Sequence, residues 1–293
     1  MAPGAIDFGR ADDAVGRLIA LALEEDVGPG DQTAEAILPL GARGVGFVYA
    51  KETLVLSGVS AAARVFRALD PRCEIEALAG EGDALDSGAG VLRIRAELRA
   101  LLSGERTALN LLQRLSGVAT KTRLWSQALA GSKTRLIDTR KTTPGMRGLE
   151  KAAVRAGGGH NHRGALFDGV LIKDNHIEAA GSIALAIRRA KAHVHPLLKV
   201  ECEVSRLEQI DVAIEAGADM LLLDNMDDAT LREAVRKVGG RVLTEASGNV
   251  SLERLPRIAA TGVDYVSAGA LTHSAGSVDL SLLIEQSDLQ RKP

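Results

Sequence analysis

Short apolar segments alternate with helical segments through most of the chain after residue 132. Six of them have the length and aliphatic composition of buried strands; they are "TRLIDTRK", "GVLIKDN", "LLKVECEV", "ADMLLLDN", "RVLTEASG" and "VDYVSAG". Glu201, Asp224, Glu245 and Ser267 follow one another at intervals of 23, 21 and 22 residues. This spacing is the βα repeat, which predicts a parallel sheet with right-handed crossovers.

The first part of the chain has a different pattern. Short β-type segments such as "RGVGFVYA" and "GVLRIRAEL" lie between stretches with apolar residues at helical spacing. Ser116–Gly117 interrupts the longest helical stretch and predicts a break there. The pattern therefore indicates an α+β unit, with predicted helices at 12–25, 60–69, 97–115 and 118–130.

Polar residues close each of the six later strands. Because the carboxyl ends of parallel strands lie at one edge, these residues are expected to meet at one ligand site. They are Asp138 and Arg140, Lys173 and Asp174, Glu201 and Glu203, Asp224, Glu245, and Ser267. Six strands are fewer than the eight of a full barrel, so an incomplete barrel and a doubly wound open sheet both remain open at this point.

Composition excludes several classes of protein. The net charge is −2, so there is no general basic field for binding nucleic acid. Only Cys73 and Cys202 occur, far apart, and two such cysteines indicate buried thiols in a reducing compartment rather than a disulfide framework. No signal peptide and no membrane-spanning segment is recognisable. The expected location is the cytoplasm, with no membrane partner.

Basic residues cluster at the ends of two consecutive predicted strands and in the segment between them. Arg140 and Lys141 follow one strand, "GGGHNHR" at 157–163 adds two histidines and Arg163, and Lys173 closes the next strand. Four permanent cations in one place predict a ligand with several carboxylates or phosphates. Each cation taken alone is equally well explained as a solvated surface charge.

Acidic residues are expected beside these cations. Alternation places Lys199, Glu201 and Glu203 on one face of a strand, and Asp224 closes the next. Carboxylates beside a polyanion site suggest a Mg²⁺ ion shared with phosphates, or hydrogen bonds to ribose hydroxyls. An internal network of salt bridges with the lysines is the alternative.

The glycine-containing turns "EASGN" (245–249) and "SAGAL" (267–271) each follow a strand and precede a predicted helix, a phosphate-binding arrangement. Two other chemistries are weaker. A zinc site would need His160, His162 and His176 amid four cations. A Schiff-base lysine, Lys141 or Lys173, would need a less crowded pocket.

The long motif "DTRKTTPGMRGLEKAAVRAGGGHNHR", followed by "LIKDNHI", "LLLDN", "EASGN" and "GVDYVSAGALTHS", resembles the quinolinate phosphoribosyltransferase family. The earlier segments "ALEEDVGPGDQT", "VLSGV" and "LLSGERTALNLLQRLSGVAT" are similar to that family too, so the resemblance runs from about residue 18 to 284.

The resemblance implies a fold that is α/β plus α+β. An N-terminal α/β sandwich domain, 1–116 joined by 275–293, would accompany an incomplete parallel α/β barrel of about six or seven strands at 117–274. It also implies a homodimer in which the sandwich of one subunit caps the barrel of the other.

The implied enzyme is a pentosyltransferase. It transfers the phosphoribosyl group of phosphoribosyl pyrophosphate to quinolinate with Mg²⁺, giving nicotinate mononucleotide, pyrophosphate and CO₂ in NAD biosynthesis. Its implied catalytic residues are Lys141, Lys173, Glu203 and Asp224, with Mg²⁺ held mainly by phosphoribosyl pyrophosphate and in part by Glu203 and Asp224. Its implied substrate-binding residues are Arg106 (from the partner subunit), Thr139, Arg140, His162, Arg163, Glu201, Ser247, Gly248, Asn249, Ala268, Gly269 and Ala270.

Two departures from the family pattern and two rivals bear on this interpretation. Gly164–Ala165 replaces a bulkier residue, and Asn249 stands where a second glycine is frequent. A paralogous group linked to molybdenum transport lacks the full "KDNH" of residues 173–176, which this chain retains. A non-catalytic anion-binding protein on the same fold would be expected to lack one of the site charges, and none is missing.

Overall fold

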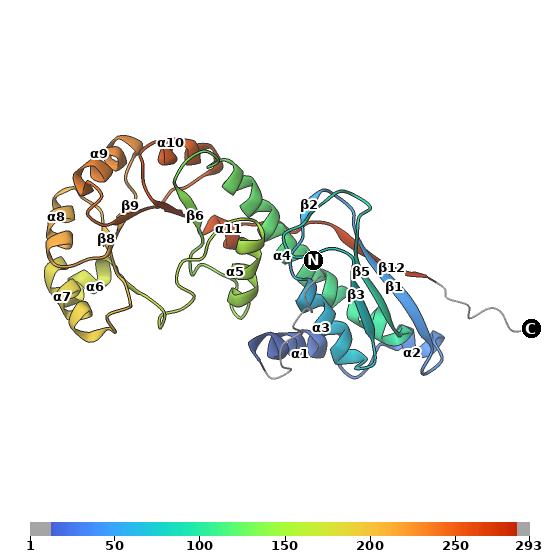
Figure 1. The fold of residues 1–293 in the computed structure, drawn as a ribbon. Coiled ribbons are helices and arrows are strands. Elements are labelled where there is room, and N and C mark those ends of the chain that lie inside the picture. The colour runs from blue at the N-terminus through green and yellow to red at the C-terminus, as the bar shows by residue number, and fades with distance from the viewer. Residues whose placement is uncertain (1–12, 286–293) are drawn as a thin grey trace, which may run out of the picture. The chain divides into compact units, whose positions relative to one another are not determined.

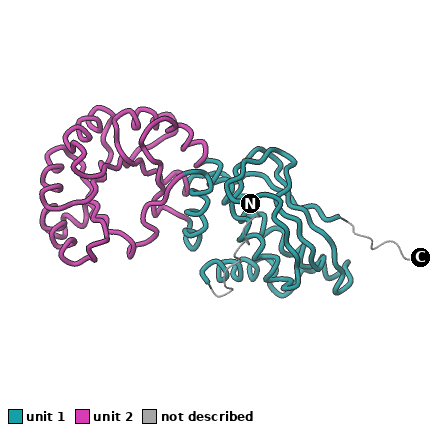
Figure 2. Tube along the Cα trace, in the orientation of Figure 1, with its two compact units in different colours: residues 1–121, 143–158, 274–293 teal, residues 122–142, 159–273 magenta. Residues whose placement is uncertain are grey.

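The computed structural model describes residues 13–285 and divides them into two compact units (Figure 2). The described part of the first unit comprises 13–121, 143–158 and 274–285, and the second comprises 122–142 and 159–273. The sequence placed the division at 116/117. The structure places it five residues later and returns the segment 143–158 to the first unit.

The second unit is built on a parallel sheet of six strands in the order β6-β11-β10-β9-β8-β7. The strands are β6 (Arg135–Ile137), β7 (Val170–Ile172), β8 (Val200–Val204), β9 (Met220–Asp224), β10 (Leu243–Ser247) and β11 (Tyr265–Ser267). The sheet curves, and the helices between its strands lie on the convex outer side (Figure 1). A doubly wound sheet would carry helices on both faces, so the incomplete α/β barrel is confirmed.

The barrel remains open between β6 and β7, which stand at the two ends of the strand order. His160 forms an isolated parallel bridge with Ile137, so the segment before β7 makes a rudimentary seventh pairing. The outer helices are α6 (Asp174–Ala180), α7 (Ile183–His193), α8 (Glu208–Glu215), α9 (Asp228–Val238) and α10 (Leu255–Ala259), with the 3₁₀ turn Leu252–Arg254 and α11 (Ala270–His273).

Alternation along β8 shows why these sequences form a barrel wall. Val200, Cys202 and Val204 are fully buried, while Glu201 and Glu203 lie on the other face, toward the interior. At the amino ends of the strands, aspartates tie neighbours together. Asp219 accepts a hydrogen bond from the Val200 N–H at 2.7 Å, and Asp264 accepts one from the Thr244 N–H at 2.9 Å.

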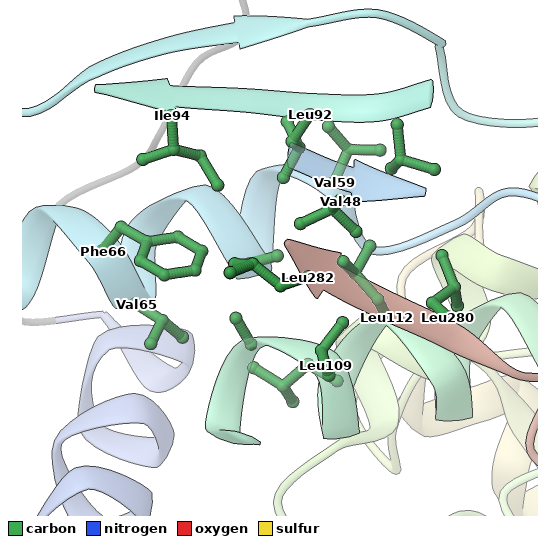
Figure 3. Packing of buried hydrophobic residues seen from close by; sticks show 14 of the residues in the cluster. Val48, Val59, Val65, Phe66, Leu92, Ile94, Leu109, Leu112, Leu280 and Leu282 are labelled. Carbon is green, nitrogen blue, oxygen red and sulfur yellow. The ribbon is translucent and has the colours of Figure 1, made fainter. Parts of the chain in front are cut away.

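The first unit pairs its antiparallel strands in the order β12-β1-β5-β3, with a separate two-stranded ladder. The strands are β1 (Arg43–Ala50), β2 (Leu54–Val55), β3 (Glu74–Ala77), β4 (Ala84–Leu85), β5 (Gly90–Glu97) and β12 (Leu280–Glu285), and the helices are α1 (Ala14–Asp26), α2 (Gln32–Ile37), α3 (Val59–Leu69), α4 (Leu98–Gln127) and α5 (Arg147–Ala156). Phe66, Leu92, Leu112 and Leu282 pack between the sheet and α3 and α4 (Figure 3).

The predicted break at Ser116–Gly117 is wrong, because α4 continues through both residues. Ser116 is fully buried, and its hydroxyl donates to the Ser57 carbonyl and accepts from the Ser57 N–H. Gly117 has a packing reason, since a Cβ at this position would overlap the backbone of Gly276. The glycine therefore permits close approach of two segments rather than a turn.

Candidate active site

A buried aspartate organises the site at the end of β6. Asp138 is completely buried and accepts hydrogen bonds from the Asn161 side chain at 2.6 Å and from the backbone N–H of His162 at 2.9 Å. The pairing of Ile137 with His160 extends to this residue, because the Asp138 N–H donates to the His160 carbonyl. The segment carrying His162 and Arg163 is thus fixed against the segment carrying Arg140 and Lys141.

Replacing Asp138 by alanine is expected to reduce stability by about 1–3 kcal/mol, because buried donors lose their acceptor. We expect kcat/KM to fall as well, by about tenfold or more, since the segment of Arg163 loses its anchor. Asp219→Ala is the matched control: it breaks a comparable tie to the Val200 N–H at the opposite end of the strands. Urea unfolding and steady-state kinetics should separate them. Equal kinetic losses in both variants would contradict the assignment of Asp138.

Three of the four predicted cations differ from Lys173 in their surroundings. Within the described residues, Arg140, Lys141 and Arg163 form no ion pair at 4.0 Å or less. The Arg163 guanidinium instead donates to the Gly169 carbonyl at 2.8 Å. Burial, followed by the nearby charge of Arg140, lowers the pKa of Arg163. Glu201 and Asp168 oppose this lowering without forming an ion pair with Arg163. Cations gathered without direct ion pairs are what an anion-binding pocket requires.

Lys173 differs from these cations. Its ammonium lies 3.5 Å from Glu203 at the end of the neighbouring strand. Burial raises the pKa of Glu203, Lys173 opposes that rise, and Asp224 adds to it, so the three groups share one electrostatic environment. The salt-bridge alternative is therefore correct for this one pair. A Schiff-base lysine needs few competing anions, so this contact with a carboxylate disfavours a Schiff base at Lys173.

Deeper in the barrel, His162, Glu201 and Glu245 form a compact cluster. The imidazole Nε2 is 3.0 Å from Glu201 and 3.6 Å from Glu245. Its Nδ1 accepts the N–H of Arg163 at 2.7 Å. Both ring nitrogens thus have partners inside the chain, so the predicted contact of His162 with a substrate carboxylate would replace one of them. A cavity of about 250 Å³ adjoins the cluster, lined by Arg163, Tyr265 and others.

The two predicted phosphate turns lie beside the other site residues. Gly248 has φ of +87°, and a Cβ there would overlap the Asn225 side chain, which also accepts from Asn249 at 3.2 Å. Asn249 itself has φ of 51°, a conformation that asparagine tolerates better than most residues. The departure from glycine at this position is thereby explained.

The second turn lies close to Lys141. The Thr272 hydroxyl donates to the Lys141 carbonyl at 2.8 Å, and a Cβ on Gly269 would overlap the Lys141 side chain. The helices expected after the two turns are short: the 3₁₀ turn and α10 follow the first, and the four-residue α11 follows the second. The N–H of Ala268 already donates to the Ile137 carbonyl at 3.0 Å. A phosphate would therefore have to use other backbone N–H groups of the two turns rather than a long helix dipole.

The remaining predicted residues are placed as follows. Thr139 accepts a hydrogen bond from the Lys141 N–H at 3.0 Å and so shapes its own turn. Arg106 is exposed on α4 in the first unit, beside a small cavity lined by residues of α1. The zinc reading is not supported in the described residues, where the candidate ligand group contains neither His160 nor His176. His176 instead accepts from the Lys173 N–H.

Asp138 and Glu245 were predicted to lie at strand ends, but the sequence pattern gave neither residue a specific role in the site. The signal in both cases was a charged residue within an otherwise apolar strand segment, which must have partners when buried.

Both cysteines are free and buried, as predicted, and burial raises the pKa of Cys202 to about 12. No helix among residues 13–285 has the length and apolar character to cross a bilayer.

Comparison with known proteins gives consistent matches over both units. Residues 31–116 match the quinolinate phosphoribosyl transferase N-terminal domain, and 118–283 match the C-terminal domain. A probable nicotinate-nucleotide pyrophosphorylase [carboxylating] of Synechocystis is 46% identical over 265 residues, covering 89% of this chain and 90% of that protein. The corresponding Bacillus subtilis protein is 43% identical over 258 residues, covering 88% and 89%.

Solved structures agree with these relatives. The nicotinate-nucleotide pyrophosphorylase of Francisella tularensis superposes with a TM-score of 0.89 at 39% identity, covering 94% of this chain and 98% of that chain. NadC from Streptococcus pyogenes gives a TM-score of 0.87 at 40% identity, covering 92% and 97%. The resemblance inferred from the motifs is confirmed: the chain belongs to the quinolinate phosphoribosyltransferase family.

Proposed function

We propose that this chain is a decarboxylating pentosyltransferase that joins quinolinate to phosphoribosyl pyrophosphate, giving nicotinate mononucleotide, pyrophosphate and CO₂ for NAD biosynthesis. The observation that carries the proposal is a set of three cations in the barrel of this family, Arg140, Lys141 and Arg163, that form no ion pair with any residue between 13 and 285. The relatives' names favour this reaction over the paralogue linked to molybdenum transport.

Quinolinate is a dianion, and the arginines suit it. Arg140 and Arg163 can each hold a carboxylate through a planar fork of donors, and Lys173 adds a compact charge nearby. We place the two carboxylates on these residues, with His162 lining the same pocket. A site with several cations and few free carboxylates prefers the dianion to nicotinate, which carries one carboxylate fewer.

Phosphoribosyl pyrophosphate takes the remaining groups. The 5′-phosphate is assigned to the two turns 247–249 and 268–270, through backbone N–H groups other than that of Ala268, which donates to the Ile137 carbonyl. Lys141 is assigned to the departing pyrophosphate. Glu203 and Asp224 close adjacent strands, and one or two carboxylates plus substrate phosphates suit Mg²⁺. Bound there, Mg²⁺ would neutralise charge on the pyrophosphate. Glu203, Asp224 and Glu201 would stabilise the positive charge that develops on the ribose carbon.

Loss of CO₂ follows from the same arrangement. Attack of the pyridine nitrogen on the ribose carbon breaks the bond to the departing pyrophosphate and makes the ring a pyridinium. When the bond to the adjacent carboxylate carbon breaks, its electron pair remains on the ring carbon, stabilised by the positive nitrogen, and a proton from solvent replaces the lost CO₂. Arg140 and Arg163 keep the ring oriented while that bond breaks. The preorganised charges of the site thus serve both steps without rearrangement.

A product assay tests this proposal directly. The purified protein is given Mg²⁺, phosphoribosyl pyrophosphate and either quinolinate or nicotinate. We expect nicotinate mononucleotide and CO₂ in equal amounts from quinolinate, and little product from nicotinate. A folded protein that is silent with both substrates would show that the site serves another anion.

We further propose a homodimer in which Arg106 completes the partner's site. Mixing two inactive variants, Arg106→Ala and Lys141→Ala, after joint unfolding and refolding is expected to restore about a quarter of wild-type activity. Half of the dimers are then mixed, and each has one intact site of two. Activity assays of the mixture and of each variant alone provide the measurement. No recovery in a confirmed dimer would place Arg106 outside the partner's site.

Location and other partners form the last part of the proposal. Two free, buried cysteines suit a reducing compartment, and we place the reaction in the cytoplasm. The balanced charge of the chain leaves nucleic acid out of the set of partners. No membrane partner is proposed.

A further inference from the structure

Two buried glutamates lie next to each other inside the barrel, and each has an oxygen without a donor. Glu201 is 5% exposed and Glu245 is 1% exposed. Oε1 of Glu201 and Oε2 of Glu245 have no hydrogen-bond partner, and the pair shares a site less than 4.8 Å across with His162. Two adjacent carboxylates cannot both remain charged at this depth without compensation.

The remaining hydrogen bonds of Glu201 and Glu245 show which of their oxygens still need a donor. Since Oε2 of Glu245 has no partner, the hydroxyl of Ser267 donates to the other oxygen of that carboxyl group. Oε2 of Glu201 lies 3.0 Å from Nε2 of His162. The carboxyl groups of Glu245 and Glu201 lie within hydrogen-bonding reach of each other. A single proton shared between them would therefore supply a hydrogen bond to two carboxyl groups that each have an oxygen without a partner.

A metal ion is the alternative, because His162, Glu201 and Glu245 could together supply three ligands. The hydrogen bonds of His162 argue against a metal ion. Nδ1 of His162 accepts the Arg163 N–H at 2.7 Å, so Nδ1 carries no proton and Nε2 carries it. A protonated Nε2 donates to Glu201 and has no lone pair for a metal. The geometry therefore favours a shared proton.

We propose that Glu245 is a positioning residue for quinolinate binding: as a neutral carboxylic acid it donates a hydrogen bond to Glu201, which accepts Nε2–H of His162 and thereby fixes the backbone of Arg163. The chain of bonds runs from Ser267 through Glu245, Glu201 and His162 to the Arg163 N–H. The kinetic consequence rests on the function proposed above, whereas the protonation of Glu245 does not.

Electrostatics support this geometry. Burial, followed by the charge of Glu201, raises the pKa of Glu245 well above its ordinary value. The charged and titratable groups around it are Glu201 on β8, His162 on the segment before β7, and Lys173 after β7, with the hydroxyls of Ser267 and Tyr265 on β11. Arg163 and Lys199 line the cavity beside the cluster. The Ser267 hydroxyl and, to a smaller extent, Lys173 favour the ionised form, and Lys173 already pairs with Glu203.

The kinetic test compares three substitutions of Glu245. Glu245→Gln places an amide N–H where the acid proton was and keeps an acceptor for Ser267, so we expect its KM for quinolinate within about threefold of wild type. Glu245→Asp keeps the carboxyl group but is one methylene too short. Glu245→Leu removes both bonds. Both should raise that KM by about tenfold or more, with little change in KM for phosphoribosyl pyrophosphate.

The relative activities of the three variants decide whether the proposed role of Glu245 in quinolinate binding holds. An active Gln variant beside impaired Asp and Leu variants is the expected result. An inactive Gln variant beside an active Asp variant would show that a charge is required and would overturn the proposal. Equal kinetics in all four proteins would overturn it too, because the bond chain would then have no role.

A stability measurement tests the proton without substrate. The unfolded state releases the Glu245 proton near its ordinary pKa, and the folded state only near its raised pKa. Between these values folding requires proton uptake, so the folding equilibrium constant of the wild type should fall about tenfold per pH unit relative to Glu245→Gln. Urea unfolding of both proteins from pH 5 to 9 measures this difference.

The stability test and the product assay can fail independently of each other. A difference between the two proteins that does not change with pH would overturn the proposal even in an active enzyme. A growing difference in a protein without the expected activity would refute the proposed function and leave the neutral Glu245 intact. A rise in Tm with added Zn²⁺ or Mn²⁺ in wild type, lost in Glu245→Gln, would show a metal site and overturn the proposal.

Discussion

Replacing Arg140 by alanine is expected to lower kcat/KM for quinolinate by about 30- to 1,000-fold, equivalent to about 2–4 kcal/mol. Arg140 has no carboxylate partner among the described residues, so its charge is not neutralised within the chain. Its removal leaves a substrate carboxylate without a charge-assisted hydrogen bond in a partly buried pocket. Steady-state kinetics with each substrate varied in turn provide the measurement.

Two companion variants sharpen this prediction. Arg140→Lys keeps the charge and loses the planar fork, so an intermediate loss is expected. Lys141→Ala should lower kcat/KM by at least about tenfold, with the effect on phosphoribosyl pyrophosphate rather than quinolinate. Arg241→Ala is the control, because Arg241 pairs with Asp211 away from the strand ends that carry the site. Near wild-type turnover in both Arg140→Ala and Lys141→Ala would refute the site assignment.

The barrel was predictable because its strands are apolar on both faces except at defined positions. The six strand segments appear in the structure in the expected parallel sheet, and β8 turns Glu201 and Glu203 inward as alternation requires. The outer helices follow from capping residues such as Ser182 and Asp227, which accept from the first turns of α7 and α9.

Other features depend on contacts that no local pattern contains. Gly117 looked like a helix break, but its role is set by Gly276, far along the chain. Lys173 resembled the other cations of the site, and only the position of Glu203 on the adjacent strand shows that it is paired. The identity of a partner is a property of packing, which sequence spacing alone does not determine.

The same reason explains Asp138 and Glu245. Each was recognised as a polar residue at a strand end, but their roles depend on which donors and acceptors surround them. Asp138 faces two donors and acts as an anchor. Glu245 faces another carboxylate and a hydroxyl, and only that combination implies a neutral acid. Arg106 was recognised through the family motif alone, since on a helix face it has the appearance of a solvated charge.

The largest loss of stability is expected from Glu150→Ala in the first unit. Glu150 is completely buried on α5, where its carboxylate accepts from the Arg114 guanidinium at 2.9 Å and from the N–H and hydroxyl of Thr143 at 3.0 and 2.8 Å. Removing Glu150 takes the carboxylate from Arg114, which keeps its bond to the Ala275 carbonyl, and leaves the Thr143 N–H without its acceptor. The free energy of unfolding should therefore fall by about 3–5 kcal/mol. Urea unfolding followed by circular dichroism measures it.

Two controls separate burial from charge. Glu76→Ala breaks the pair with Arg93, in which both side chains are exposed, and should cost less than about 1 kcal/mol. Replacing Arg114 and Glu150 together by methionine should cost less than Glu150→Ala alone, since no buried charge is then left unpaired. A Glu150→Ala loss as small as that of Glu76→Ala would contradict a buried, compensated pair. The segment 143–158 would then owe its place in the first unit to its apolar contacts, including those of Met146 and Leu149 with the core.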